Sequence, residues 1–353
     1  EAYNKALAIR PDYEAALNNV VVALKTQGKT GEKRLKKALE TYNKALALKA
    51  ENANSIFMEG VDLSIEGKLD AAIDAIKKSL SLAPNFPAAH NELASIFLNQ
   101  GKRQDAIKSY ESYLLLNSDN EQNRVYKLHE QAHICDWVGI EEDRALISNL
   151  GCCKQPVDPM RCIAFEDAPE RHRTRSEIYA AATYQQRPLP GKAKPSQKPK
   201  RIRLGYFSSD LKEHPVAYLM AKMLEQHDRD QFEVFGYSIH GNQQSDMRQR
   251  LSQSFDSFAD VQGMSDRDVA LQAWQDGIDI AIDLNGYTQY SRTGIFAYRA
   301  APIQINYLGY PGTLGANFMD YIVADKFLIP EENQKYFNEQ PLYLPNTYMP
   351  TDD

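Results

Sequence analysis

The sequence predicts two architectures in one chain: an α-helical solenoid in the first third, then a helical connector and an open α/β lobe with a parallel sheet. Three observations support this prediction. Side chains recur with a period near 34 within residues 1–118, helical spacing without that period continues to residue 184, and short apolar runs alternate with helix-like runs from residue 201 onward. The length of 353 residues exceeds one ordinary core, so several domains are expected.

The first 118 residues repeat one pattern of large, turn-forming and helix-ending residues. Large side chains stand at Tyr3, Tyr42, Ile76 and Tyr110, and the helix-ending positions are Pro11, Ala50, Pro84 and Ser118. Both sets are separated by 39, 34 and 34 residues, and 34 is the length of a tetratricopeptide repeat. Each unit should supply two helices that cross at a small residue and turn at a glycine. The small residues are Gly60 and Ala94, and the turning glycines are Gly28, Gly67 and Gly101.

The longer first interval comes from five extra residues within 29–37, which we expect to lie in a turn. Two to three such repeats form a concave groove that usually binds a peptide or another protein, and they also allow the chain to form oligomers.

Residues 119–184 keep helical spacing without the repeat, which predicts a helical connector. Its residues His129 and His133 are four positions apart, a spacing that can chelate a metal ion. No acidic third ligand follows at the needed position, so no metal site is predicted. Residues 185–200 hold four prolines and many lysines, which predicts a flexible or extended linker before a lobe at 201–353.

Composition argues against several classes of function. The formal net charge of −6 gives no support for binding along a nucleic-acid backbone. No run of 18 apolar residues occurs and the first residues are not a signal peptide, so neither a membrane protein nor a secreted one is predicted. Cys135, Cys152, Cys153 and Cys162 lack disulfide or metal spacing and are interpreted as reduced thiols in the cytoplasm. The chain starts inside a helical pattern, so we expect a fragment of a longer protein.

Strands and helices alternate from residue 201 onward. Predicted strands cover residues 202–207, 232–238, 278–284, 303–308 and 321–324, and predicted helices cover residues 216–227, 265–276 and 291–299. This alternation implies a parallel sheet with helices on both faces, so that all strands end at one edge. Ligands of open α/β sheets bind outside that edge, where the N-terminus of a following helix favours an anion.

Three loops should open on this edge of the sheet. The first carries His214 directly before Pro215, which suits the first turn of a helix. His214 is therefore either a group that reaches a substrate or a solvent-facing helix cap, and histidine titrates near neutral pH. The second loop contains residues 285–288. The third is the run 309–315, whose three glycines let backbone N–H groups approach a ligand.

Five groups of residues in the lobe resemble one known family. They are 202–210 with 214–215, 232–235, 276–279 with 283–288, 299–304 with 308–313, and 319–322. These resemble the O-GlcNAc transferase and SPINDLY family, and tetratricopeptide repeats before such a lobe strengthen the match. The resemblance implies an inverting, metal-independent glycosyltransferase of the two-lobed GT-B type, which moves a sugar from a nucleotide donor to Ser or Thr of a protein. Residues 201–353 would form the first lobe, and the second, with most donor contacts, is expected after residue 345.

The resemblance also implies roles for individual residues. His214 would lie in the active site, as the base or as a group that positions the acceptor or donor. Seven residues would line the same cleft: Asn285, Tyr287, Thr288, Tyr310, Pro311, Gly312 and Thr313. A ladder of asparagines would capture peptides along the solenoid, but only Asn19 keeps it here, with Met58 and Glu92 at the equivalent places.

The expected partners are protein acceptors and a nucleotide sugar, and no cofactor or metal ion is expected. UDP-GlcNAc and GDP-fucose both remain as donors, with UDP-GlcNAc favoured. The alternative from another class is a repeat scaffold that binds partners without catalysis. The retained His214 and its neighbouring loops argue against that alternative.

Overall fold

The computed structural model describes residues 28–153, 155–189, 200–241 and 244–352. Contacts within the chain divide it into two compact units, and the division falls between residues 140 and 141. It lies inside the segment 119–184 that the sequence predicts as a connector, so helices of that segment belong to both units. None of the helices in the described part of the chain is long and apolar enough to cross a membrane.

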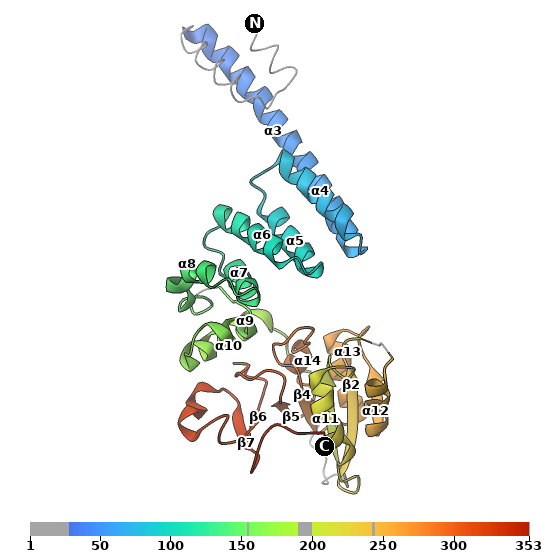
Figure 1. The fold of residues 1–353 in the computed structure, drawn as a ribbon. Helices are drawn as coiled ribbons and strands as arrows, with labels where there is room; N and C mark the ends of the chain where they lie inside the picture. Colours follow the sequence, from blue (N-terminus) through green and yellow to red (C-terminus); the bar gives the residue numbers. More distant parts are fainter. Residues whose placement is uncertain (1–27, 154, 190–199, 242–243, 353) are drawn as a thin grey trace. The chain divides into compact units, whose positions relative to one another are not determined.

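The described part of the first unit is helical (Figure 1). Its helices are α3 (Gly28–Ile65), α4 (Leu69–Leu82), α5 (Pro87–Asn99), α6 (Arg103–Leu116), α7 (Glu121–His133) and the start of α8 (Trp137–Ile147). Ile76 and Tyr110 are buried in one core with Phe97, as the repeat pattern predicts. Gly67 and Gly101 turn the chain in the left-handed conformation, at φ values of 77° and 71°. The repeat helices from α4 to α6 are therefore confirmed.

The prediction for the first repeat boundary is wrong. α3 runs without interruption through residues 29–37, which were expected in a turn, and through Ala50, which was expected to end a helix. Ala50 stands where the next repeat has Pro84. Alanine keeps its N–H group and has the highest helix propensity, so nothing at this position breaks the helix. Tyr3, Pro11 and Asn19 lie outside the described residues.

The second unit contains a seven-stranded parallel sheet with the order β3-β2-β1-β4-β5-β6-β7. Its strands are β1 (Ile202–Ser208), β2 (Phe232–Ser238), β3 (Ser257–Asp260), β4 (Ile280–Asp283), β5 (Ile303–Asn306), β6 (Tyr321–Ala324) and β7 (Gln340–Tyr343). The five predicted strands and their parallel arrangement are confirmed. β3 and β7 were not predicted, since neither strand contains a buried residue and so neither carries a strong apolar pattern.

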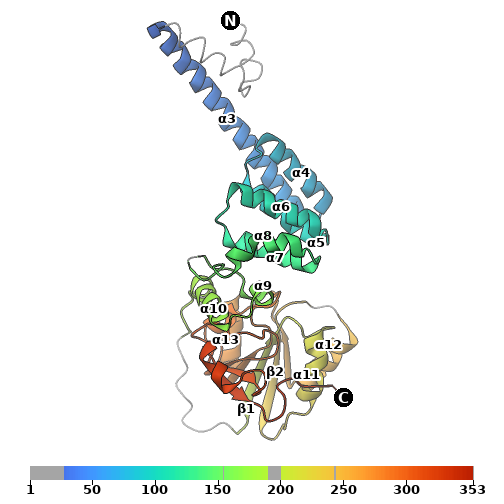
Figure 2. The same cartoon turned by 60° about the vertical axis from the view of Figure 1, so that its left-hand side comes forward.

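Helices cover both faces of this sheet (Figure 2). On one face, α11 (Pro215–Glu225) and α12 (Asp246–Ser254) bury Met220 and Leu251 against β1 residue Leu204. On the other face, α13 (Asp266–Asp276) and α14 (Gly294–Ala297) bury Ala273 and Phe296 against β1 residue Phe207. Because successive side chains of a strand point to opposite faces, one strand supplies both cores. β1 is therefore a central strand, and its residues 204–208 are buried.

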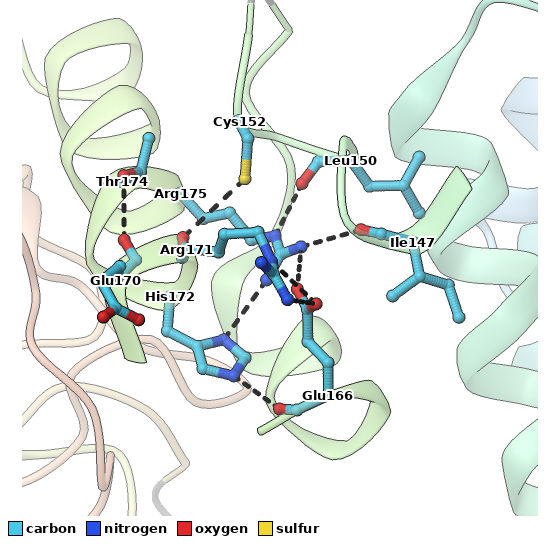
Figure 3. Close-up of polar contacts among 9 residues, drawn as sticks. All are labelled: Ile147, Leu150, Cys152, Glu166, Glu170, Arg171, His172, Thr174 and Arg175. Atoms are coloured by element: carbon cyan, nitrogen blue, oxygen red, sulfur yellow. Dashed lines mark hydrogen bonds and ion pairs between the residues drawn. The ribbon is translucent and has the colours of Figure 1, made fainter. Parts of the chain in front are cut away.

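Arg175 joins two helical parts of the connector within the second unit (Figure 3). It lies on α10 (Pro169–Thr183), is 1% exposed, and donates hydrogen bonds to the carbonyl oxygens of Ile147 (2.8 Å) and Leu150 (2.6 Å). It also pairs with Glu166, which accepts a second hydrogen bond from Arg171. Burial alone would raise the pKa of Glu166, but the hydrogen bonds from both arginines outweigh it and lower that pKa. Arg175 thus satisfies the carbonyl groups at the end of α8.

The other connector elements in this unit are α9 (Pro159–Cys162) and the 3-10 turn η1 (Ile163–Phe165), and a second 3-10 turn, η2 (Glu331–Tyr336), precedes β7.

α10 packs tightly on the lobe. Gly315 has a φ of 61°, and a Cβ atom there would lie 2.4 Å from the backbone nitrogen of Glu177. The Asn338 amide also donates to the Glu177 carboxylate at 3.0 Å. Leu189, at the start of the predicted linker, is buried, and its N–H bonds to the carbonyl oxygen of Tyr298 at 2.8 Å. Leu189 therefore lies against the lobe, and residues 190–199 are outside the described part.

Candidate active site

The strand order reverses between β1 and β4. From β1 the chain continues to β2 and β3 on one side of the sheet, and then returns to place β4 on the other side of β1. Such a reversal separates the two loops that leave the carboxyl ends of the neighbouring strands, and ligands of open α/β sheets bind there. The loops after β1 and β4 are the ones that carry His214 and Asn285.

Asn285 connects these two loops. Its Oδ1 accepts a hydrogen bond from the backbone N–H of Ser209 at 2.8 Å. Its Nδ2 donates to the Ser209 hydroxyl at 2.8 Å and to Asp210 Oδ2 at 2.7 Å, and it also approaches the Thr288 hydroxyl at 3.1 Å. Asn285 is fully buried, so its amide has no water to exchange for these partners. The two loops are therefore fixed relative to each other.

Asp283, the last residue of β4, shapes the loop that begins with Asn285. Its Oδ1 accepts from the backbone N–H groups of Asn285 (2.9 Å) and Gly286 (3.1 Å). Burial raises the pKa of this carboxyl to about 6, and the two N–H groups offset only part of that effect. The carboxyl group of Asp283, with its pKa of about 6, thus bonds directly to the backbone of Asn285, the residue that connects the two loops.

His214 caps helix α11. Its backbone is extended, and its Nδ1 accepts the backbone N–H of Val216 at 3.3 Å, with Pro215 in the first turn. The same Nδ1 lies 3.8 Å from Asp210 Oδ2, and the side chain is 39% exposed. Nε2 has no hydrogen-bond partner among the residues that the structure describes, so it is the ring atom available to a ligand.

The position of the ring proton decides what Nε2 can do. When Nδ1 accepts from Val216, a neutral ring carries its proton on Nε2, which is then a hydrogen-bond donor. When the proton is on Nδ1, toward Asp210, Nε2 becomes a proton acceptor. The helix N-terminus itself offers few free donors, because Pro215 has no N–H and the Val216 N–H is already bonded.

Besides Asn285, three of the predicted cleft residues have buried side chains: Tyr287, Tyr310 and Thr313. Tyr287 donates its hydroxyl to the carbonyl oxygen of Leu314 at 2.5 Å, and its ring lies 5.2 Å from that of Tyr310, centroid to centroid. Thr313 donates to the buried carboxylate of Glu339 at 2.5 Å. The two contacts of Tyr287 hold the loops after β4 and β5 against each other, and the bond of Thr313 fixes the loop after β5 to the residue before β7. The cleft role of the three residues stays a prediction, while their side chains support the edge from inside the lobe.

The remaining cleft residues reach the surface. Thr288 and Gly312 are half-buried, and Pro311 is exposed. Together with His214 they are the predicted site residues that a ligand at this edge can contact directly. Asn285 is buried, and its hydrogen bonds fix the loops after β1 and β4 relative to each other.

The loop after β4 also carries contacts that the sequence did not predict. Tyr290 adopts a left-handed φ of 62°, and its ring stacks on His240, in the loop after β2, with the centroids 4.1 Å apart. Arg292 donates to the carbonyl oxygens of Val261 (3.0 Å) and Met264 (2.7 Å), which follow β3. In order along the chain, this loop therefore contacts the ends of β1, β2 and β3. Nothing in a single sequence marks these loop residues, because their partners are 28 to 50 positions away.

The pair His129 and His133 shows ring contact at 4.5 Å between centroids. Within the described ranges, no group of three or more His, Cys, Asp or Glu side chains is placed to hold a metal ion. Met58 is exposed and Glu92 half-buried on the repeat helices, while Asn19 lies outside the described residues.

Comparison with known families bears on the region that contains this edge. The model described as Glycosyl transferase family 41 matches residues 175–353, which is half of the chain. The chain belongs to glycosyl transferase family 41. The family 41 region begins in α10 and includes all seven strands, His214 and Asn285. A tetratricopeptide repeat model matches residues 87–120, which contain α5 and α6. The resemblance inferred from the sequence is thereby confirmed.

Curated relatives match less than half of this chain. The chain is 42% identical over 153 residues to SEC of Arabidopsis thaliana, a probable UDP-N-acetylglucosamine-peptide N-acetylglucosaminyltransferase, covering 43% of this chain and 16% of that protein. It is 41% identical over 154 residues to the UDP-N-acetylglucosamine-peptide N-acetylglucosaminyltransferase of Caenorhabditis elegans, covering 43% of this chain and 13% of that protein. SPINDLY of Arabidopsis thaliana is 28% identical over 151 residues, covering 42% of this chain and 16% of that protein. The matches thus span less than a fifth of each relative.

A solved structure shares the fold. A mutant O-GlcNAc transferase from Thermobaculum terrenum matches with a TM-score of 0.57 at 22% identity, over 95% of this chain and 58% of that chain. The combination of repeat helices and a parallel-sheet lobe, expected as the first lobe of a GT-B fold, is therefore confirmed.

Proposed function

We propose that this protein is a protein O-glycosyltransferase, which transfers a sugar with inversion from a nucleotide donor to the hydroxyl of Ser or Thr in protein acceptors. The observation that carries the proposal is the arrangement at the switch point of a family 41 lobe. There, Asn285 joins the loops after β1 and β4 beside His214, whose Nε2 is available to a ligand.

The proposed reaction requires two catalytic functions. The acceptor hydroxyl has a high pKa and must lose its proton as it attacks the anomeric carbon, and the departing diphosphate must be stabilised. We assign activation of the acceptor hydroxyl to His214, which acts either as the base or as the group that orients the acceptor or donor. The pH profile of transfer separates these roles. A base requires the neutral ring, so transfer falls as His214 becomes protonated, whereas a purely orienting donor keeps working in its protonated form.

For the diphosphate we propose stabilisation by backbone N–H groups and lysines of a second lobe, without a metal ion. The limited supply of free donors at the start of α11 supports this placement. Transfer should then persist in excess EDTA. Loss of transfer with chelator, restored by Mg²⁺ or Mn²⁺, would contradict this part of the proposal.

We favour UDP-GlcNAc as the donor, because the two relatives at 41% and 42% identity carry names that specify UDP-N-acetylglucosamine. GDP-fucose is the alternative. Calorimetric titration of the full-length protein with UDP and with GDP, followed by transfer assays with both labelled sugars, decides between them. Binding and transfer with GDP-fucose alone would overturn the UDP-GlcNAc assignment.

We further propose that the repeats recruit protein acceptors and that the protein works in the cytoplasm. The buried, well-packed repeat core of α4 to α6 and the repeat model match support the first statement. The four free cysteines support the second. A scaffold without catalysis is the competing function. Absence of transfer with either donor, together with retained binding of a protein partner, would favour that scaffold.

A further inference from the structure

A second buried polar residue lies beside Asp283. Asn306 ends β5, and the two residues are partners in the register of the parallel pair β4 and β5. Register partners on neighbouring strands point to the same face, about 4.8 Å apart. Two positions earlier, Ala281 belongs to the core on the α13 side, and Gln304 bonds to Phe296 in that core. Asp283 and Asn306 therefore share this face, and they are 2% and 0% exposed.

Polar atoms of this pair have no partner. Among the residues that the structure describes, Asp283 Oδ2, Asn306 Oδ1 and Asn306 Nδ2 make no hydrogen bond. More than about nine in ten buried polar groups in native proteins are bonded, so three unbonded atoms on two adjacent side chains need an explanation. Side chains of this length on adjacent strands reach each other by rotation about their side-chain torsions.

Among the residues that the structure describes, no cation contributes to the pKa shift of Asp283. Its neighbours across the sheet are Phe207 on β1 and Asn306 on β5, and the titratable group that faces it is the phenol of Tyr184, at the end of α10. Burial is the main cause of the raised pKa of Asp283, about 6, so the carboxyl changes charge close to neutral pH. A primary amide is the side chain that suits such a group. Its Oδ1 accepts a hydrogen bond from a protonated carboxyl. When the amide group rotates by half a turn, its Nδ2 donates a hydrogen bond to an ionised carboxylate.

We propose that Asn306 is the partner of the free Asp283 oxygen in both protonation states, and that this pair positions the loop that begins with Asn285. Asn285 in turn bonds to Asp210, whose Oδ2 lies 3.8 Å from His214 Nδ1. Asp283 and Asn306 are thus positioning residues, and their importance for transfer rests on the proposed function. The structural part of the proposal is tested without any activity.

The first test replaces the Asp283 carboxyl by a group that cannot ionise. Asp283→Asn keeps an oxygen for the two loop N–H groups but cannot ionise. A carboxyl with a folded-state pKa near 6 and a reference value of 3.8 stabilises the fold fully below pH 3.8 and loses that contribution as pH rises through 6. The folding equilibrium constant of Asp283→Asn should therefore rise relative to the wild type by about two orders of magnitude between pH 4 and pH 7. Urea unfolding across this range measures the ratio.

A matched control is Asp228, whose pKa is shifted in the opposite direction. Hydrogen bonds from Gln231 and from the Asp230 backbone lower the pKa of Asp228, so its contribution changes below pH 3.8 and not between pH 4 and 7. Asp228→Asn should show no rise in this window. A flat ratio for Asp283→Asn would overturn the proposed titration.

The second test removes the partner. Asn306→Leu removes the amide from both forms of the carboxyl, and the bond to the ionised form is the stronger because it is charge-assisted. The Asp283 midpoint should therefore shift upward by roughly one pH unit, a tenfold change in its ionisation equilibrium. The imidazole NMR signals of His214, assigned by their loss in His214→Gln, should shift as well. Asn306→Ala gives the same comparison if leucine is not accommodated. An unchanged midpoint, or His214 signals identical to those of the wild type, would overturn the positioning role. Transfer assays on the same variants then report on the proposed function separately.

Discussion

Replacing Asn285 by alanine should destabilise the lobe and release the loops after β1 and β4 from each other. The Asn285 amide accepts from the backbone N–H of Ser209 at 2.8 Å and donates to Asp210 Oδ2 at 2.7 Å. Alanine provides neither group. It leaves the buried Ser209 N–H without an acceptor and the Asp210 carboxylate without its closest donor.

The magnitude follows from these two unpaired groups. A buried polar group without a partner costs about 1–3 kcal/mol, so two of them cost roughly 2–6 kcal/mol if neither finds a substitute. The Asp210 side chain keeps 11% of its surface exposed, and limited access to water reduces its share. We therefore expect the free energy of unfolding of the lobe to fall by about 2–4 kcal/mol.

Urea unfolding followed by the fluorescence of Trp274, a residue of the lobe, measures this change. Asn338→Ala is the matched control, because Asn338 is exposed and its side chain makes a single surface hydrogen bond, to Glu177 at 3.0 Å. The control should stay within about 0.5 kcal/mol of the wild type. If Asn285→Ala also stayed within that limit with the same m-value, Asn285 would not be the connection between the two loops.

Three further predictions concern other parts of the chain. Burial raises the pKa of Glu339, so its ionisation weakens the fold as pH rises above about 4.5. Unfolding of Glu339→Gln should depend less on pH in that range, and an identical pH profile would refute this. Gly315→Ala should cost more than about 2 kcal/mol, because its Cβ would meet the Glu177 backbone at 2.4 Å in a left-handed conformation. A thermal melt within 2 °C of the wild type would contradict that reasoning. Deleting residues 1–117 should reduce transfer to protein acceptors more than hydrolysis of the sugar nucleotide. Equal loss of both activities would mean that the repeats only support the fold.

The sequence predicted the central sheet well, because its buried strands carry a strong signal. β2 has the predicted bounds and β1 differs by one residue, since both are apolar runs covered on two faces. The edge strand β3 escaped prediction because Ser257 and Asp260 are exposed and give it no apolar pattern. α3 was misjudged for a different reason: the position of Ala50 in the repeat was used as evidence for a helix end, although its chemistry favours a helix.

The candidate site was only partly visible in the sequence. His214 and Asn285 were found because each follows a recognisable strand. The bond between Asn285 and Asp210 joins residues 75 positions apart, and only the strand order brings them together. Tyr287 and Tyr310 are expected to line the cleft, and that role stays a prediction. The structure packs both rings in the core, where large aromatic side chains gain most from burial.

The measurement that tests the central claim most directly is sugar transfer by the full-length protein with asparagine in place of His214. Asparagine is a strong helix N-cap, so His214→Asn should keep the α11 cap and the stability of the wild type, while His214→Ala should lose about 1 kcal/mol. If His214 acts on the reacting groups, both variants should transfer labelled GlcNAc to protein acceptors about 10²–10⁴ times more slowly than the wild type. Transfer by His214→Asn within about threefold of the wild type would show that His214 is only a helix cap.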